Sequence, residues 1–185
     1  MSTGWYTDEE LLNIGFANIG KNFLLSKKGS IYGASNITIG DNVRIDDFVS
    51  ISSSGLIKIG SNVHIGSFSY MAGLESIILE GCVGIAQGVR IYSTVDDFYG
   101  FGLVGPMVDG KYRKVKSAPV QIKKYSAIGS GSTILPGVTV GFNSGVGAMS
   151  LVNHDVEDNV LVSGVPAKKI WVRSKKGYER YEKDN

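Results

Sequence analysis

Aliphatic residues recur at every sixth position along most of this chain. In the C-terminal half the step joins Ile122, Ile128, Ile134, Val140, Val146 and Val152. In the N-terminal half it gives three triplets: Ile39, Ile45 and Ile51; Ile59, Ile65 and Met71; Leu79, Ile85 and Ile91. The triplets start 20 residues apart, so three hexapeptides and two extra residues form one unit. Neither the 3.6-residue period of a helix nor the two-residue period of a strand explains this step.

The six-residue step predicts an all-β fold, a parallel β-helix of hexapeptide repeats. Each hexapeptide supplies one short strand and one turn, and three of them complete a coil. The aliphatic side chains then stack from coil to coil at ~4.8 Å, and stacking supplies the core that no single coil has. Asp41-Asn42 and Ser61-Asn62 occupy equivalent turns, where a positive φ is common. A β-sandwich or barrel with glycine-rich turns is the alternative, but it does not require so long a register.

The chain is expected to form one domain over residues 1–185, with the β-helix spanning 19–173. Thr7 and Glu10 form a capping-box pattern and predict a helical cap over 7–17, whose Leu11, Leu12 and Phe16 face the first coil. Residues 174–185 lack the repeat and are expected to form a short helix or to fray.

A loop of residues 92–118 interrupts the repeat. Loops of this length inside a compact repeat are usually functional. A floppy insertion is the alternative, and it is disfavoured because Phe98, Tyr99, Phe101 and Tyr112 would be costly to leave in solvent.

The composition limits the function. The chain is 43% hydrophobic and 19% charged with a net charge of +2, which indicates neither a nucleic-acid partner nor a membrane surface. No apolar run approaches the ~20 residues of a membrane span. Cys82 is the only cysteine, so no intrachain disulfide forms and a cytoplasmic location is expected.

Several segments together resemble the hexapeptide-repeat acetyltransferases. They are IGDNVRIDDF, NVHIGSFSY, VRIYSTVDDFYG, SAIGSGSTILPGVTVG and the ending VSGVPAKKI. They are most similar to the galactoside, maltose and O-antigen sugar acetyltransferases. The resemblance implies a left-handed parallel β-helix and a homotrimer with active sites between subunits. It also implies transfer of acetyl from acetyl-CoA to a hydroxyl or amino group of a sugar or nucleotide-sugar, with surface polysaccharide synthesis as one setting.

The sequence departs from that family where many members place a catalytic histidine, because Ser93 to Asp97 contains none. Only His64 and His154 can serve as a histidine base. The repeat aligns His64 with Arg44 one coil before and Gly84 one coil after. We therefore expect His64 to be the general base; a surface histidine at a turn is the alternative.

The acceptor site is expected at the long loop. His64 and Asp96 lie on different corners of the coil, so Asp96 or Asp97 of a neighbouring chain would orient His64 or bind the sugar. The residues expected to bind the acceptor are Arg44, Asp97, Tyr99 and Tyr70.

The donor is expected along the last coils, where small residues leave room for a pantetheine arm. These residues are Ala127, Gly129, Gly147, Ala148 and Ser150. Lys168, Lys169 and Arg173 are expected to meet the CoA phosphates. His154 is interpreted as a surface residue.

Other functions fit the sequence less well. No metal is expected, because one cysteine and two histidines have no ligand-like spacing, and a γ-carbonic-anhydrase-like site needs three histidines. A thiol intermediate on Cys82 is disfavoured for lack of a nearby histidine. The remaining alternatives are an acetyltransferase for a non-sugar small molecule and a non-catalytic β-helix assembly module.

Overall fold

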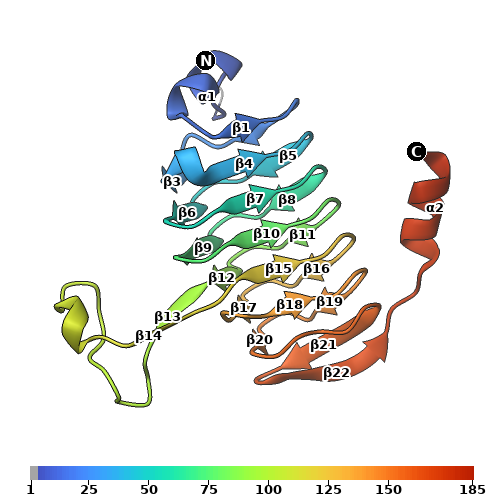
Figure 1. Cartoon of the computed structure of the whole chain (residues 1–185). Coiled ribbons are helices and arrows are strands. Elements are labelled where there is room, and N and C mark those ends of the chain that lie inside the picture. The colour runs from blue at the N-terminus through green and yellow to red at the C-terminus, as the bar shows by residue number, and fades with distance from the viewer. Residues whose placement is uncertain (1–3) are drawn as a thin grey trace.

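The computed structural model describes residues 4–185 as a three-sided column of stacked strands (Figure 1). The first sheet contains β1 (Asn18–Ile19), β4 (Ile37–Ile39), β7 (Ile57–Ile59), β10 (Ile77–Leu79), β15 (Val120–Ile122) and β18 (Thr139–Val140). The second contains β2 (Leu24–Leu25), β5 (Val43–Ile45), β8 (Val63–Ile65), β11 (Gly84–Ile85), β16 (Ala127–Ile128), β19 (Gly145–Val146), β21 (Val160–Gly164) and β22 (Ala167–Val172). The third contains β3 (Ser30–Tyr32), β6 (Ser50–Ser53), β9 (Tyr70–Gly73), β12 (Arg90–Tyr92), β17 (Thr133–Ile134) and β20 (Leu151–Val152).

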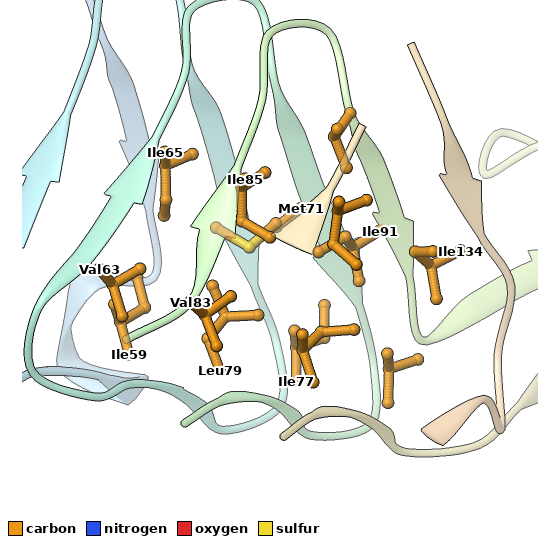
Figure 2. Close-up of a cluster of buried hydrophobic side chains, with 14 of the residues drawn as sticks. Ile59, Val63, Ile65, Met71, Ile77, Leu79, Val83, Ile85, Ile91 and Ile134 are labelled. Carbon is orange, nitrogen blue, oxygen red and sulfur yellow. The ribbon is translucent and has the colours of Figure 1, made fainter. Parts of the chain in front are cut away.

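The predicted register of the parallel β-helix is confirmed. Ile39 pairs with Ile59, and Ile59 with Leu79, so the 20-residue spacing places equivalent residues of successive coils side by side. After the loop the same row continues from Leu79 to Ile122. Figure 2 shows Ile59 and Leu79 of this row among other hydrophobic side chains inside the column. The repeating aliphatic is therefore the core residue, and each coil is stable only against its neighbours.

Small residues also line the core at the fifth position of the C-terminal hexapeptides. Ser126, Ser132 and Ser144 are buried, and their hydroxyls are satisfied by backbone carbonyls. Ser126 Oγ donates to the Gly141 carbonyl at 2.7 Å. A buried hydroxyl that had no such acceptor would cost free energy, so these serines tie adjacent coils together as well as filling the corners.

The ends of the column differ in detail from the prediction. The cap α1 (Asp8–Ile14) is shorter than 7–17, because Gly15 ends it in the left-handed region at φ 85°. The capping box of Thr7 and Glu10 is present. Leu11 is buried, but Leu12 is exposed, so the expectation that Leu12 faces the first coil was wrong. Adjacent residues of a helix point about 100° apart, so Leu11 faces the first coil while Leu12 faces outward.

The other end does not continue as a regular coil to residue 173. β22 turns back and pairs antiparallel with β21, so a hairpin closes the second sheet. The tail then forms α2 (Lys176–Asp184), which lies beside the column (Figure 1). Tyr178 of α2 stacks on Tyr125 with ring centroids 5.4 Å apart, and the Tyr181 hydroxyl accepts a hydrogen bond from Asn62 at 3.3 Å. The tail is therefore anchored to the corner between the first and second sheets.

The long loop leaves the column between β12 of the third sheet and β15 of the first. Its stem is an antiparallel pair, β13 (Thr94–Asp96) and β14 (Val115–Ser117). The arm projects away from the column (Figure 1) and contains the short 3₁₀ helix Gly110–Tyr112. A second 3₁₀ helix, Ala34–Asn36, lies in a turn of the column. The loop aromatics are not buried within the chain: Phe98 is 85% exposed and Tyr99 is 89% exposed. No helix in the described part of the chain is long and apolar enough to span a membrane.

Candidate active-site groove

A groove runs across the outer surface of the second sheet, perpendicular to its strands. Its floor is one register row, in which His64, Gly84, Ala127 and Gly145 follow one another from coil to coil. The groove encloses about 460 Å³. It exists because side chains on this face are missing or reduced to a methyl group over three successive strands. At ~4.8 Å per strand the floor is ~14 Å long.

His64 stands at the N-terminal end of this groove, and its partner is a carboxylate of the same chain. Its Nε2 lies 2.8 Å from Asp46 Oδ2. The other oxygen of Asp46 accepts a hydrogen bond from Arg44 Nε at 2.6 Å. Because a carboxylate only accepts, Nε2 carries the hydrogen in neutral His64 and Nδ1 keeps the lone pair. This tautomer is the one that a general base needs.

The charges around Asp46 keep it ionised. Burial raises the pKa of Asp46, but hydrogen bonds from His64 and Arg44 lower it more, so the pKa lies below its ordinary value. The ring of Trp5 lies 5.3 Å from the Arg44 guanidinium, which holds that side chain against the column. Asp46 is therefore an anion at neutral pH, and its negative charge lies against the imidazole of His64.

Arg173 and Leu161 close the opposite end of the groove. The Arg173 guanidinium donates to the Ser144 carbonyl at 2.6 Å and to the Tyr125 carbonyl at 3.4 Å. Burial lowers the pKa of Arg173, yet an arginine remains protonated at neutral pH. The groove thus has a histidine–carboxylate pair at one end and a fixed positive charge at the other.

The other residues expected to bind the donor lie in different places. Gly129 is part of the groove, and the exposed Ala148 follows Gly147 at the corner beside it. Ser150 is buried, and its hydroxyl donates to the Gly147 carbonyl at 2.7 Å, so it belongs to the core. The two predicted lysines, on the exposed strand β22, do not line the groove; Lys169 pairs with Glu157 at 3.1 Å.

The loop carboxylates form hydrogen bonds within the loop. Asp97 accepts hydrogen bonds from the backbone amides of Tyr99, Phe101 and Gly102, which shapes the turn. Asp96 pairs with Arg113 at 3.2 Å and accepts from the Gly105 amide at the same distance. Neither carboxylate contacts His64 within the chain. Asp46 holds the position beside the imidazole that sequence analysis gave to a neighbour's aspartate.

A single chain does not bring its loop to its own groove. The loop leaves the corner between the third and first sheets, and that corner lies opposite the second sheet, where the groove is. Tyr70 lies on the third sheet, packed 5.6 Å from the ring of Tyr92. The residues predicted for catalysis and acceptor binding therefore form two separate groups, one around His64 and one around the loop.

Sequence analysis missed Asp46 and Leu161, and it did not place Gly145 on the groove floor. The available signal was the register. Asp46 follows Ile45 at the turn next to the row of Arg44 and His64, and Gly145 precedes Val146 as Gly84 precedes Ile85. Marking the outward position of each hexapeptide, as well as the inward one, would have revealed a row of small residues.

Known proteins resemble the chain along its whole length, although no protein-family model matches it. It is 39% identical over 173 residues to the dTDP-4-amino-4,6-dideoxy-D-glucose acyltransferase of Escherichia coli, covering 92% of this chain and 90% of that protein. It is 30% identical over 162 residues to the lipopolysaccharide O-acetyltransferase WbbJ of Escherichia coli K12, described as putative, covering 84% of this chain and 71% of that protein.

Solved structures agree with these relatives. AntD, an N-acyltransferase from Bacillus cereus solved with dTDP and 3-hydroxybutyryl-CoA, superposes with a TM-score of 0.95 and 40% identity over 99% of this chain and 97% of AntD. A hexapeptide-repeat acetyltransferase of Vibrio cholerae solved with acetyl-CoA superposes with a TM-score of 0.60 at 24% identity, over 89% of this chain and 75% of that one, which shows the shared fold. With its repeat, its groove and these relatives, the chain belongs to the hexapeptide-repeat, acyl-CoA-dependent sugar acyltransferases.

Proposed function

We propose that this protein transfers an acyl group from acyl-CoA to the amino group of a dTDP-linked aminodeoxysugar, in the cytoplasm. The groove that joins His64 to Arg173 carries the proposal, because it suits an extended thioester donor with its reacting end at the imidazole. The likeness to AntD and to the Escherichia coli acyltransferase supports the nucleotide-sugar acceptor. It favours an amine over the hydroxyl that the name of WbbJ implies.

The geometry suggests how the residues divide the chemistry. The pantetheine arm lies along the groove over Gly84 and Ala127, with its far end toward Arg173. The acceptor nitrogen attacks the thioester carbonyl carbon, a C–N bond forms and the C–S bond breaks. His64 Nδ1 takes the proton that the nitrogen loses, and the leaving CoA thiolate takes it in turn. No covalent enzyme intermediate is needed.

The first experiment compares acceptors. We expect release of free CoA with a dTDP-4-amino-4,6-dideoxyhexose and acetyl-CoA, and at least a hundredfold lower kcat/KM with the matching 4-hydroxy sugar nucleotide. The same assay with longer acyl donors defines the acyl group. Preference for the hydroxyl acceptor would contradict N-acylation, and absence of CoA binding in calorimetry would favour the non-catalytic assembly module.

We further propose a homotrimer in which the loop of one chain covers the groove of the next. Phe98, Tyr99 and Met107 are 85%, 89% and 96% exposed within one chain, and so much apolar surface on an ordered arm indicates a partner surface. The separation of loop and groove in a single chain points the same way, because a neighbour would unite them. Asp96 would then enter the active site beside His64 and bind the acceptor.

Light scattering tests this assembly. The mass should be about three times the 19.8 kDa of the chain, and the double variant Phe98→Asp, Met107→Asp should reduce it to that of one chain. Both side chains are exposed within a single chain, so the double variant should keep the thermal unfolding transition of the β-helix. Tyr32→Asp, an exposed residue on the third sheet, is the control. A double variant with the mass of wild type would contradict the assembly.

A further inference from the structure

The corner between the second and third sheets carries an unusual ladder of side chains. In each coil, one residue at this corner adopts a left-handed backbone conformation, and we call its level in the column a tier. These residues are Phe48, Phe68, Gly88, Gly131 and Met149, with φ between 57° and 71°. Backbone hydrogen bonds connect the tiers without a break, from Phe68 N to the Asp47 carbonyl and from Gly88 N to the Ser67 carbonyl. We call these five residues the second corner. It borders the groove, because Ala86 of the groove lies two residues before Gly88.

Phenylalanine is a poor choice for two of these tiers. Residues other than glycine and asparagine seldom adopt a positive φ, and a bulky aromatic residue is sterically strained in that conformation. At the corner between the first and second sheets, most of the equivalent residues are asparagine, as at Asn42 and Asn62, and the exceptions are Cys82 and Tyr125. Phe48 and Phe68 are 50% and 66% exposed, so they do not serve the core. A strained residue that serves neither backbone nor core indicates a function.

The two rings form a platform with one unused face. Their centroids are 5.0 Å apart with an interplanar angle of 18°. The Lys28 ammonium lies 5.5 Å from the centroid of Phe48. Lys28 and Phe68 thus both pack against Phe48, and the next position along the ladder above Phe68 is Gly88. The platform ends in a ring that faces the Gly88 tier.

The Gly88 tier is empty. A Cβ placed on Gly88 would meet only the backbone of Gly131, at 3.8 Å. One tier further on, the place of a side chain at Gly131 is taken by the Met149 sulfur. A slot therefore lies between the Phe68 ring and the Met149 thioether. Both walls suit a flat aromatic ligand, since rings stack on rings and sulfur packs favourably against them.

A cation stands beside the slot. Arg90 is exposed, two residues after Gly88, and its guanidinium enters none of the ion pairs or side-chain hydrogen bonds found among residues 4–185, although its backbone amide donates to the Ser132 carbonyl. Its neighbour in register on the third sheet is Tyr70. A guanidinium next to an aromatic slot matches the two parts of a nucleotide, a base and its phosphates.

We propose that the pyrimidine base of the acceptor nucleotide stacks on Phe68 in the Gly88 tier, with Arg90 at its phosphates; this rests on the proposed function. Position favours the acceptor over the donor. The Gly88 tier belongs to the coil of Gly84, directly next to the coil of His64, so it lies at the reacting end of the groove. An extended donor with its thioester at His64 has its own base beyond Arg173, several coils away.

Filling or removing the stack tests the assignment. Gly88→Phe supplies a third ring in a backbone conformation that Phe48 and Phe68 already adopt, and Phe68→Leu removes the ring beneath the base. We expect the Kd for dTDP to rise roughly 5- to 100-fold in each variant, with the Kd for CoA unchanged. Phe48→Leu is the matched control, because its ring has no contact with the slot; the dTDP affinity should stay within about twofold of wild type.

The outcomes separate this inference from the function on which it rests. If wild type acylates the aminosugar nucleotide and both variants bind dTDP normally, the slot assignment is overturned and the function stands. A weakened CoA affinity in place of dTDP would overturn it by assigning the slot to the donor's adenine. A changed oligomeric mass in either variant would overturn it, because the second corner would then be a contact between copies of the chain. If wild type binds no dTDP, both proposals fail.

Discussion

His64→Ala is expected to lower kcat by about 10²- to 10⁴-fold while leaving the fold and the affinity for CoA unchanged, because general bases contribute about that much. The side chain is half exposed and contributes nothing to the core, so its loss does not unfold the column. The measurement is the rate of CoA release at saturating donor and acceptor, with thermal unfolding recorded in parallel.

His154→Ala is the matched control, since it removes the other histidine of the chain. His154 is exposed, and its Nδ1 lies 2.7 Å from the side-chain oxygen of Asn153. It lines none of the groove. We expect its kcat to remain within about twofold of wild type. A loss of less than tenfold in the kcat of His64→Ala would show that His64 is not the general base. The loop carboxylates would then be the next candidates.

Asp46→Asn adds a second test of the same pair. The amide has the shape of the carboxylate but can present its NH₂ to Nε2, which favours the wrong tautomer of His64 and withdraws the negative charge. The pKa of Asp46 is lowered by His64 and Arg44 despite its burial, so wild type keeps this carboxylate ionised across the neutral range. We therefore expect a clear loss of kcat in Asp46→Asn, and any acid limb of the wild-type pH profile to arise from groups other than Asp46.

The inward half of this fold was predictable from the sequence, and the outward half largely was not. The core rows depend only on a period, and the period is visible because a buried position tolerates few residue types. That is why Ile39, Ile59 and Leu79 could be aligned at a spacing of 20 residues, whereas the pairing of Leu79 with Ile122 across the loop came from the structure. The row of Arg44, His64 and Gly84 followed from the same register.

Contacts between outward side chains depend on rotamers, which a repeat does not specify. His64 could be placed next to Arg44 by register, but the carboxylate between them comes from the turn and reaches both through its χ angles. The anchoring of α2 was equally invisible, because Tyr178 and Tyr181 pack on Tyr125 through a chain reversal at β22 that has no repeat signal. The loop aromatics were expected to be buried, and they are exposed in the single chain.

Ala127→Trp is expected to abolish CoA binding, with the Kd rising at least a hundredfold. Ala127 lies on the groove floor between Gly84 and Gly145, and its side chain is exposed. An indole there occupies the path of the pantetheine arm along the groove floor. Because the residue points outward, the core rows beneath it are untouched and the folded column should keep its stability.

Thr38→Trp is the matched control. It also points outward from a strand, but from β4 of the first sheet, away from the groove. It should bind CoA as wild type does. Comparing the CoA affinities of the two variants separates a specific effect on the groove from a general effect of a large side chain on the surface. If Ala127→Trp retained wild-type affinity for CoA, the donor would have to lie elsewhere. Nothing would then place the thioester beside His64, because that placement depends on a donor that runs along this floor from Arg173.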